Sequence, residues 1–374
     1  MKLQRYGALA GAALIGMATL SACGSDNNGA TAAGTTSPAA AGSMAATTSA
    51  IACGSGTLAM AGSTAQANAI SQWTKDYQTA CSGATINYTA NGSGAGVTSF
   101  TDGQAVVAGS DYSLSSTQQP AADTHCGTGN TAINIPAVPG AIAVIFNIPN
   151  VTSLNLSAKN LAAIFAGTIS NWDDPAIKAD NPTATLPNLP IQTFHRADTS
   201  GTSYNFSNYL HSLVPSAPAA NKQWPFSAGT GETGSSAVAA KVKATSGSIG
   251  YAEYSYATSN SLSYAEVSNA AGTFVPLTQA NANNFIAQAQ VTQTGSNTVL
   301  NFNYNYSNAS AYPAVLITYE IACSGGNGSN ADLIKGFLNY IVSPTAQGEL
   351  TNLGYVPLPP AIATDDAKAI SSLS

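Results

Sequence analysis

The sequence predicts an α/β fold built on doubly wound sheets. Three successive short apolar strands end in polar, small-residue turns: GSTAQ at residues 62–66, NGSGAGV at 91–97 and GSDYSL at 109–114. In a doubly wound sheet such turns lie side by side in the crevice at the carboxyl ends of the strands. We therefore expect the ligand-binding site in that crevice.

Two long apolar segments predict that the chain passes twice between two lobes. Residues 133–148, INIPAVPGAIAVIFNI, lead out of the first lobe, and residues 311–323, AYPAVLITYEIAC, lead back. We expect lobe I to comprise residues 53–140 with 315–374, and lobe II to comprise residues 141–314. Each lobe then has its own doubly wound sheet, and a two-segment hinge joins the two sheets.

Hydrophobic periodicity predicts further elements in both lobes. Residues 248–257, SIGYAEYSYA, have the pattern of a buried strand, and residues 291–306 alternate like a β-hairpin for which we predict no function. Helical patterns cover residues 158–166, 201–213 and 331–341.

The amino terminus has the pattern of a secretory signal over residues 1–22. Lys2 and Arg5 precede an apolar run that is short for a membrane span, and Leu-Ser-Ala-Cys follows at residues 20–23. That tetrapeptide resembles a bacterial lipobox, which would make Cys23 the lipidated first residue of a mature protein at the outer face of the membrane. A plain cleaved signal is the alternative. Residues 23–52 are mostly Gly, Ala, Ser and Thr, which predicts a flexible stalk.

Composition points to an exported, acidic binding domain. Charged residues make up only 7% of the chain and hydrophobic residues 44%, which is enough for a large core. Loss of Lys2 and Arg5 with the signal changes the formal charge from -6 to -8, so we do not expect a nucleic-acid partner. Because the net charge is negative, an anion would have to be bound by a local arrangement of donor groups and not by the overall charge.

The cysteines predict two disulfides. Apart from Cys23 there are four, and an even number in an exported chain favours pairing with three possible connectivities: Cys53, Cys81, Cys126 and Cys323. No C-x-x-C pair is present, and no His, Asp and Glu residues stand at metal-ligand spacing, so we expect neither a metal nor a cofactor.

The segment HRADTSGTSYNF at residues 195–206 gathers most of the anion-binding chemistry. Arg196 is the only arginine left once the signal is removed, and a helix pattern begins just after it. A helix N-terminus offers unpaired N–H groups and partial positive charge, and a guanidinium beside it favours an oxyanion. The ordinary alternative is helix capping by Asp198, Ser200 or Thr202.

These motifs resemble the phosphate-binding lipoproteins that serve Pst-type ABC phosphate importers. The resemblance rests on AGSTAQ, NGSGAGV, AGSDYSL and HRADTSGTSYNF in family order, and it continues through NLAAIFAGTISNWDDPAI, GSIGYAEYSYA and YVPLPPAI. It implies a type II-like, two-lobed periplasmic binding protein that closes by a hinge motion. It also implies a bacterial, extracytoplasmic, lipid-anchored monomer that delivers inorganic phosphate to transmembrane permease subunits.

The resemblance also implies a set of phosphate ligands. At Ala65, where many relatives carry an aromatic residue, only the backbone N–H is used. Asp111, supported by Asp198, is expected to set selectivity. The full set is Thr64, Ala65, Ser93, Asp111, Arg196, Asp198, Ser200, Gly201 and Thr202.

Four other functions compete with phosphate binding. Ser93, His195 and Asp111 could form a hydrolase or phosphatase triad, but the G-x-S-x-G elbow is missing. There is no G-x-x-x-x-G-K-[ST] loop for a nucleotide, and a structural adhesin would not explain the lone arginine. A binding protein for another oxyanion is the fourth alternative. We therefore expect no enzymatic activity.

Strand order then favours one disulfide connectivity. Cys53 and Cys81 each precede one of two strands that should be parallel neighbours. Cys126 also precedes a strand, and Cys323 ends the antiparallel strand expected beside it. We expect the pairs Cys53 with Cys81 and Cys126 with Cys323.

Overall fold

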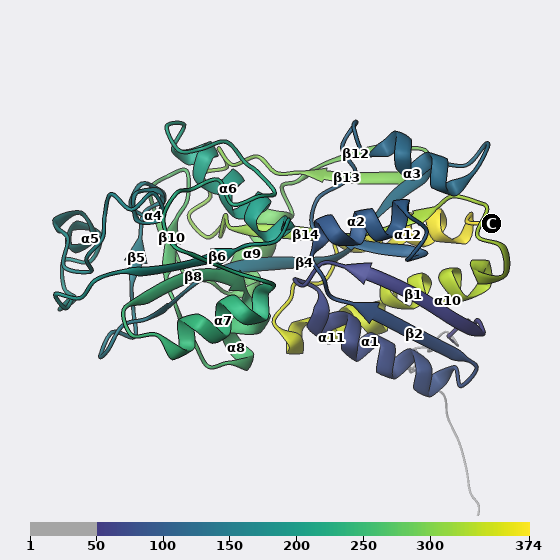
Figure 1. The fold of residues 1–374 in the computed structure, drawn as a ribbon, viewed down its shortest axis with the longest axis horizontal. Coiled ribbons are helices and arrows are strands. Elements are labelled where there is room, and N and C mark those ends of the chain that lie inside the picture. The colour runs from purple at the N-terminus through teal and green to yellow at the C-terminus, as the bar shows by residue number, and fades with distance from the viewer. Residues whose placement is uncertain (1–50) are drawn as a thin grey trace, which may run out of the picture. The chain divides into compact units, whose positions relative to one another are not determined.

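A computed structural model describes residues 51–374, and Figure 1 shows their mixed α/β architecture. The first strands are parallel neighbours, and a helix follows each of them. Helix α1 buries Ile70, Trp73 and Tyr77 at spacings of three and four, as its pattern predicted. These elements are β1 (Gly56–Gly62), α1 (Ala67–Ala80), β2 (Ala84–Thr89), α2 (Ser93–Thr101), β3 (Val107–Ser110) and α3 (Gln119–Cys126).

Two buried strands carry the chain between the two lobes: β4 (Ala132–Asn147) and β14 (Val315–Cys323). They pair with each other antiparallel up to Ala141 and Val315, and from Ile142 onward β4 pairs with β8 instead. The strand order is therefore β2-β1-β3-β14-β4-β8-β6-β7, with β9 also on β4. The two predicted sheets are continuous with each other because β4 belongs to both.

The second half of this sheet carries the elements of lobe II. Strand β8 confirms the buried strand predicted from residue 248, but that strand ends at Glu253. Residues 254–257 belong to helix α8, so the prediction of a strand there was wrong. The alternating tyrosines of this helix have the period of a strand, which explains the error. The elements are β5 (Asn155–Leu156), α4 (Ala158–Phe165), α5 (Pro175–Asp180), β6 (Gln192–Arg196), α6 (Gly201–Leu213), β7 (Thr230–Glu232), α7 (Ser235–Ala244), β8 (Ser248–Glu253), α8 (Tyr254–Ser259), β9 (Ser263–Tyr264), β10 (Glu266–Ser268), β11 (Phe274–Val275) and α9 (Gln279–Ile286).

The predicted hairpin consists of β12 (Gln290–Thr294) and β13 (Asn297–Asn301), joined by Gly295 and Ser296. Although it falls in the segment predicted for lobe II, Asn297 Oδ1 accepts hydrogen bonds from the backbone and side-chain amides of Asn134 on β4, each 2.8 Å long. In Figure 1 the hairpin lies along the same end of the sheet as α3. The predicted lobe boundaries stay a prediction.

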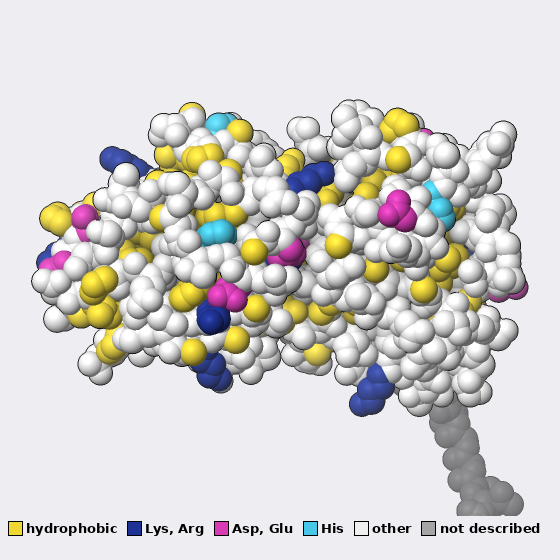
Figure 2. All heavy atoms as spheres, viewed as in Figure 1, with side chains coloured by type: hydrophobic (Ala, Val, Ile, Leu, Met, Phe, Trp, Pro, Cys, Tyr) yellow, Lys and Arg dark blue, Asp and Glu magenta, His cyan; other side chains and the backbone are white. Residues whose placement is uncertain are grey.

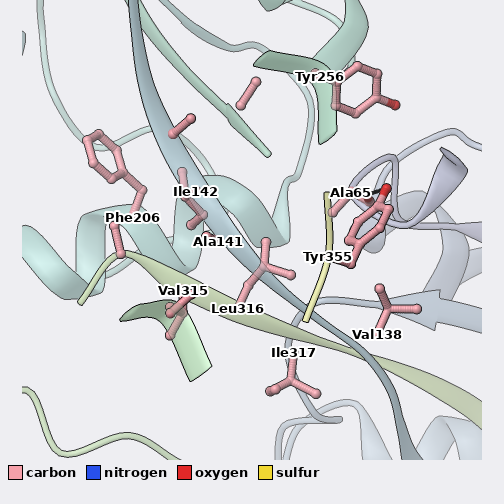
Figure 3. Packing of buried hydrophobic residues seen from close by; sticks show 14 of the residues in the cluster. Ala65, Val138, Ala141, Ile142, Phe206, Tyr256, Val315, Leu316, Ile317 and Tyr355 are labelled. Atoms are coloured by element: carbon pink, nitrogen blue, oxygen red, sulfur yellow. Dashed lines mark hydrogen bonds between the residues drawn. The ribbon is translucent and has the colours of Figure 1, made fainter. Parts of the chain in front are cut away.

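The carboxyl-terminal helices pack against lobe I. They are α10 (Ala331–Ile341), α11 (Pro344–Glu349) and α12 (Pro360–Ser371). The indole N–H of Trp73 donates to the Ala346 carbonyl at 3.0 Å, which ties α1 to α11. Figure 3 shows part of the buried core, including Ala141 and Ile142 of β4 and Val315 of β14, which pairs with Ala141.

The structure contains both predicted disulfides. Cys53 pairs with Cys81 and Cys126 pairs with Cys323, and each pair has a Cα–Cα distance of 5.3 Å. The second bond joins residues 197 positions apart in sequence, so it fixes the end of α3 to the end of β14.

The predicted signal peptide, Cys23 and most of the stalk lie outside the described residues. Within residues 51–374, no helix has the length and apolar character that a membrane crossing requires. Figure 2 shows that charged side chains are few and scattered on the face in view, in keeping with the low charged fraction of the sequence.

Candidate anion-binding site

Four helix N-termini meet where the two lobes face each other. Helices α1 and α2 begin in lobe I, and α6 and α7 begin in lobe II. Thr64, just before α1, accepts a hydrogen bond from the backbone N–H of Ser235 at the start of α7, and the two hydroxyl oxygens lie 3.0 Å apart. Four N-termini concentrate unpaired N–H donors and partial positive charge at one point. This arrangement suits a small oxyanion.

Arg196 supplies the only guanidinium of the described chain and is buried, with 2% of its surface exposed. It ends β6, and its Nε and Nη2 both donate to the Asp198 carboxylate, in a fork geometry with Nε–Oδ1 of 2.7 Å. Nη1 points the other way and donates to the hydroxyls of Ser235 at 3.0 Å and Thr202 at 3.3 Å. Asp198 therefore fixes the plane of the guanidinium while Nη1 faces the helix N-termini.

Burial and ion pairing act in opposite directions on this pair. Burial alone would lower the pKa of Arg196, but the hydrogen bonds and charge of Asp198 raise that pKa above its ordinary value. Burial would likewise raise the pKa of Asp198, and the contacts with Arg196 lower it instead. Both groups are therefore charged at neutral pH.

Asp111 follows the end of β3 and is buried. Its Oδ1 accepts hydrogen bonds from the hydroxyls of Ser63 and Thr318, the latter at 2.7 Å, and its Oδ2 accepts one from Ser93 at 3.0 Å. Burial raises the pKa of Asp111 to about 6, although the hydroxyl of Ser63 acts to lower it. The pairing of β14 with β4 shifts register between Thr318 and Tyr319, next to this contact.

Close packing at two positions requires glycine. A Cβ on Gly201 would lie 2.7 Å from both Asp111 Oδ2 and the Ser93 hydroxyl. Gly92 has a φ of 96°, and a Cβ there would collide with the Asp198 carboxylate. Lobe I and lobe II therefore approach each other to van der Waals contact at the site.

The structure brings the predicted site residues together, although two of them have local partners. Ser200 caps α6, since its hydroxyl accepts from the Ser203 N–H at 3.2 Å. The N–H of Ala65 donates to the Ser63 hydroxyl at 2.9 Å. The side chains of Thr64, Arg196 and Thr202, by contrast, form a connected polar network through Ser235.

Sequence reasoning missed four residues that contact this network: Ser63, Ser235, Glu253 and Thr318. Ser235 had a usable signal, because Gly234-Ser235 repeats the Gly-Ser step that opens α2 at Ser93. Glu253 is buried, and its Oε1 accepts from the Thr202 hydroxyl at 2.6 Å. Its Oε2 has no hydrogen-bond partner among residues 51–374.

The geometry does not support a catalytic triad. Ser93 donates directly to Asp111, whereas His195 Nδ1 lies 3.0 Å from the Arg196 carbonyl oxygen and its ring stacks on Trp224. Within the described part of the chain, His195 has no hydrogen bond to Ser93 or Asp111. The same part contains no group of three or more His, Cys, Asp or Glu residues arranged to hold a metal ion.

Comparison with known proteins agrees with this geometry. A family model described as PBP superfamily domain matches residues 47–345. The phosphate-binding protein PstS 3 of Mycobacterium tuberculosis is 38% identical over 381 residues, and PstS 2 of the same organism is 36% identical over 382 residues. Each alignment covers 100% of both chains. A solved high affinity periplasmic phosphate-binding protein bound with phosphate has the same fold, with a TM-score of 0.67 at 21% identity over 83% of this chain and 92% of that chain. The chain therefore belongs to the PBP superfamily and, within it, to the PstS phosphate-binding proteins.

Proposed function

We propose that the mature protein binds one inorganic phosphate between its lobes, as a monomer, and delivers it to the permease subunits of an ABC importer. It is a binding protein and not an enzyme. The observation that carries the proposal is the contact of Arg196 Nη1 with hydroxyls at two helix N-termini, with Asp111 across the same interface as an acceptor. Phosphate uses both kinds of partner, because it has oxygens that accept and a P–OH that donates.

The proposed ligands follow from this arrangement. Arg196 and the helix N-termini donate to the phosphate oxygens, and Asp111 accepts a hydrogen bond from the P–OH group. Asp198 orients Arg196. The hydroxyl of Ser235 is added to the proposed donors because it is hydrogen-bonded to Arg196 Nη1. The proposed set is Thr64, Ala65, Ser93, Asp111, Arg196, Asp198, Ser200, Gly201 and Thr202, with Ser235 added.

Calorimetric titration of the purified domain with phosphate tests the function directly. About ten charge-assisted hydrogen bonds of roughly 1.5–3 kcal/mol each, less the costs of association and closure, predict a dissociation constant of about 1 μM or tighter with one site per chain. Arsenate and sulfate titrations run in parallel distinguish phosphate from other oxyanions. Tighter binding of another oxyanion, or no binding at all, would contradict the proposal.

We further propose that Cys23 carries a lipid anchor that holds the protein at the outer face of the membrane. Residues 24–52 would then be the tether, and about 30 residues of flexible chain span roughly 30 Å. Replacing Cys23 by alanine should release the phosphate-binding protein into the medium, as measured by immunoblot of cells and supernatant. A Ser21→Gly change, which keeps the lipidated cysteine, is the matched control. Retention of the Cys23→Ala protein on cells would argue against the anchor.

A further inference from the structure

Lys222 crosses the opening between the two lobes. It belongs to the segment between α6 and β7, and its ammonium donates to Gln118 Oε1 at 2.9 Å, next to the start of α3 in lobe I. The same ammonium lies 3.7 Å from the centre of the Tyr112 ring, which follows β3 in lobe I. One side chain of lobe II therefore makes two polar contacts with lobe I.

The position of Lys222 is fixed from its own side as well. Its carbonyl oxygen accepts a hydrogen bond from the Ser200 N–H at 2.9 Å, which ties it to the N-terminus of α6. Two residues further on, Trp224 is packed in an aromatic cluster with Phe206 and Tyr251, with ring centroids 6.1 and 4.7 Å away. The ammonium therefore sits on a rigid support beside the anion site.

The contact of Lys222 with Tyr112 divides the crevice between the lobes. On one side a cavity of about 390 Å³ reaches Asp111, bounded by α6 and the β12–β13 hairpin. On the other side a cavity of about 530 Å³ reaches Asp198 along α2. Lys222 and Tyr112 line both cavities. The contact therefore lies at the wall of both cavities that reach these two carboxylates.

Among the residues that the structure describes, Lys222 has no acidic partner to neutralise it. None of the four ion pairs among residues 51–374 includes it. Its charge is held instead by the π face of Tyr112 and by the Gln118 amide oxygen, an arrangement that stabilises a cation in a partly desolvated place. Burial lowers the pKa of Lys222 from its ordinary value.

We propose that Lys222 is a latch: its contact with Tyr112 and Gln118 holds the lobes closed over bound phosphate and slows release of the ligand. The inference rests on the proposed phosphate binding and adds a residue outside the phosphate ligands. A contact made only in the closed state stabilises that state relative to the open one. Its loss therefore appears mainly in the dissociation rate.

The test measures release of radiolabelled phosphate from the purified domain during a chase with excess unlabelled phosphate. Lys222→Met and Tyr112→Leu should each speed release by about threefold to tenfold, which is the range of a partly buried cation–π contact. The double variant should be no faster than the faster single variant, because both changes remove the same contact. Tyr112→Phe should release phosphate at the wild-type rate, because it keeps the ring and removes only a hydroxyl that has no hydrogen-bond partner among the described residues.

Two controls separate the latch from other effects. Lys75→Met removes one charge from an exposed position on α1 and should leave release unchanged. Lys222→Arg keeps a cation over the ring and should stay within about twofold of wild type. Release from Lys222→Met at the wild-type rate, or strictly multiplicative effects in the double variant, would overturn the latch. Absence of phosphate binding by the wild-type protein would instead refute the proposed function.

Discussion

Replacing Arg196 by alanine is expected to weaken phosphate binding by about a hundredfold to ten-thousandfold. The change removes two guanidinium donors aimed at the hydroxyls of Ser235 and Thr202, and charge-assisted hydrogen bonds contribute about 1.5–3 kcal/mol each. At about 1.4 kcal/mol per tenfold, two such bonds account for two to four orders of magnitude. The change also leaves Asp198 without its cation, so the site becomes repulsive to an anion.

Calorimetry on the purified variant measures this loss, and a thermal melt without phosphate shows whether the variant folds. Arg196→Lys is the informative companion. It keeps the charge but cannot reproduce the two-point contact with Asp198, so we expect an affinity between those of wild type and Arg196→Ala. A dissociation constant for Arg196→Ala within tenfold of wild type would remove Arg196 from the site.

Selectivity against sulfate is expected to depend on Asp111 and to fade in acid. Ser63 and Thr318 occupy Oδ1, whereas Oδ2 accepts only from Ser93, so one acceptor position of Oδ2 is left for a ligand proton. Phosphate keeps a proton near pH 7 and can donate there, but sulfate cannot. Burying sulfate against the Asp111 carboxylate costs several kcal/mol, or about a thousandfold in affinity.

The pH dependence follows from the raised pKa of Asp111. Because burial raises this pKa to about 6, the carboxylate takes up a proton as the pH falls from 7 to 5 and can then donate to sulfate. Sulfate affinity should rise by up to about tenfold for each unit as the pH falls from 8 towards 6, and it should level off below about 5. Ionised Asp111 opposes folding above pH 6, and this penalty is relieved as the pH falls through 6 towards 4.

Competition of sulfate against labelled phosphate between pH 5 and 8 measures both effects. Asp111→Asn keeps the shape of the side chain and presents an amide donor, so it should bind sulfate with little dependence on pH. Wild-type protein that binds sulfate within tenfold of phosphate at pH 7 would show that Asp111 does not discriminate.

The parts of the site that could be predicted are those with a local signal. Thr64, Ser93 and Asp111 each follow a short apolar strand, and the turn after such a strand is readable from Gly and Ser residues. Helix α6 was predicted with the observed bounds because Ser200 caps it and its apolar stripe starts at once. Both disulfide pairs were predicted correctly, because the strands beside the four cysteines could be recognised from local sequence.

The missed residues lack such signals. Thr318 lies inside an apolar strand, and it meets Asp111 through the pairing of β14 with β3, strands more than 200 positions apart in sequence. Glu253 is the last residue of β8, and polar site residues are expected at strand ends. The tyrosines that follow it alternate as in a strand, so the sequence did not show that β8 ends there. A single sequence does not show which distant strands pair, and it misleads where a helix has the alternating pattern of a strand.

The continuity of β4 and β14 has a mechanical consequence. At the boundary the two strands are hydrogen-bonded side by side, with the Ile142 N–H donating to the Ala314 carbonyl at 2.7 Å. Two hydrogen-bonded strands form a ribbon that bends easily out of the plane of the sheet, whereas the hydrogen bonds resist sliding of one strand along the other. We therefore expect opening to be mainly a rotation about this ribbon, so that a single angle would distinguish the loaded protein from the empty one.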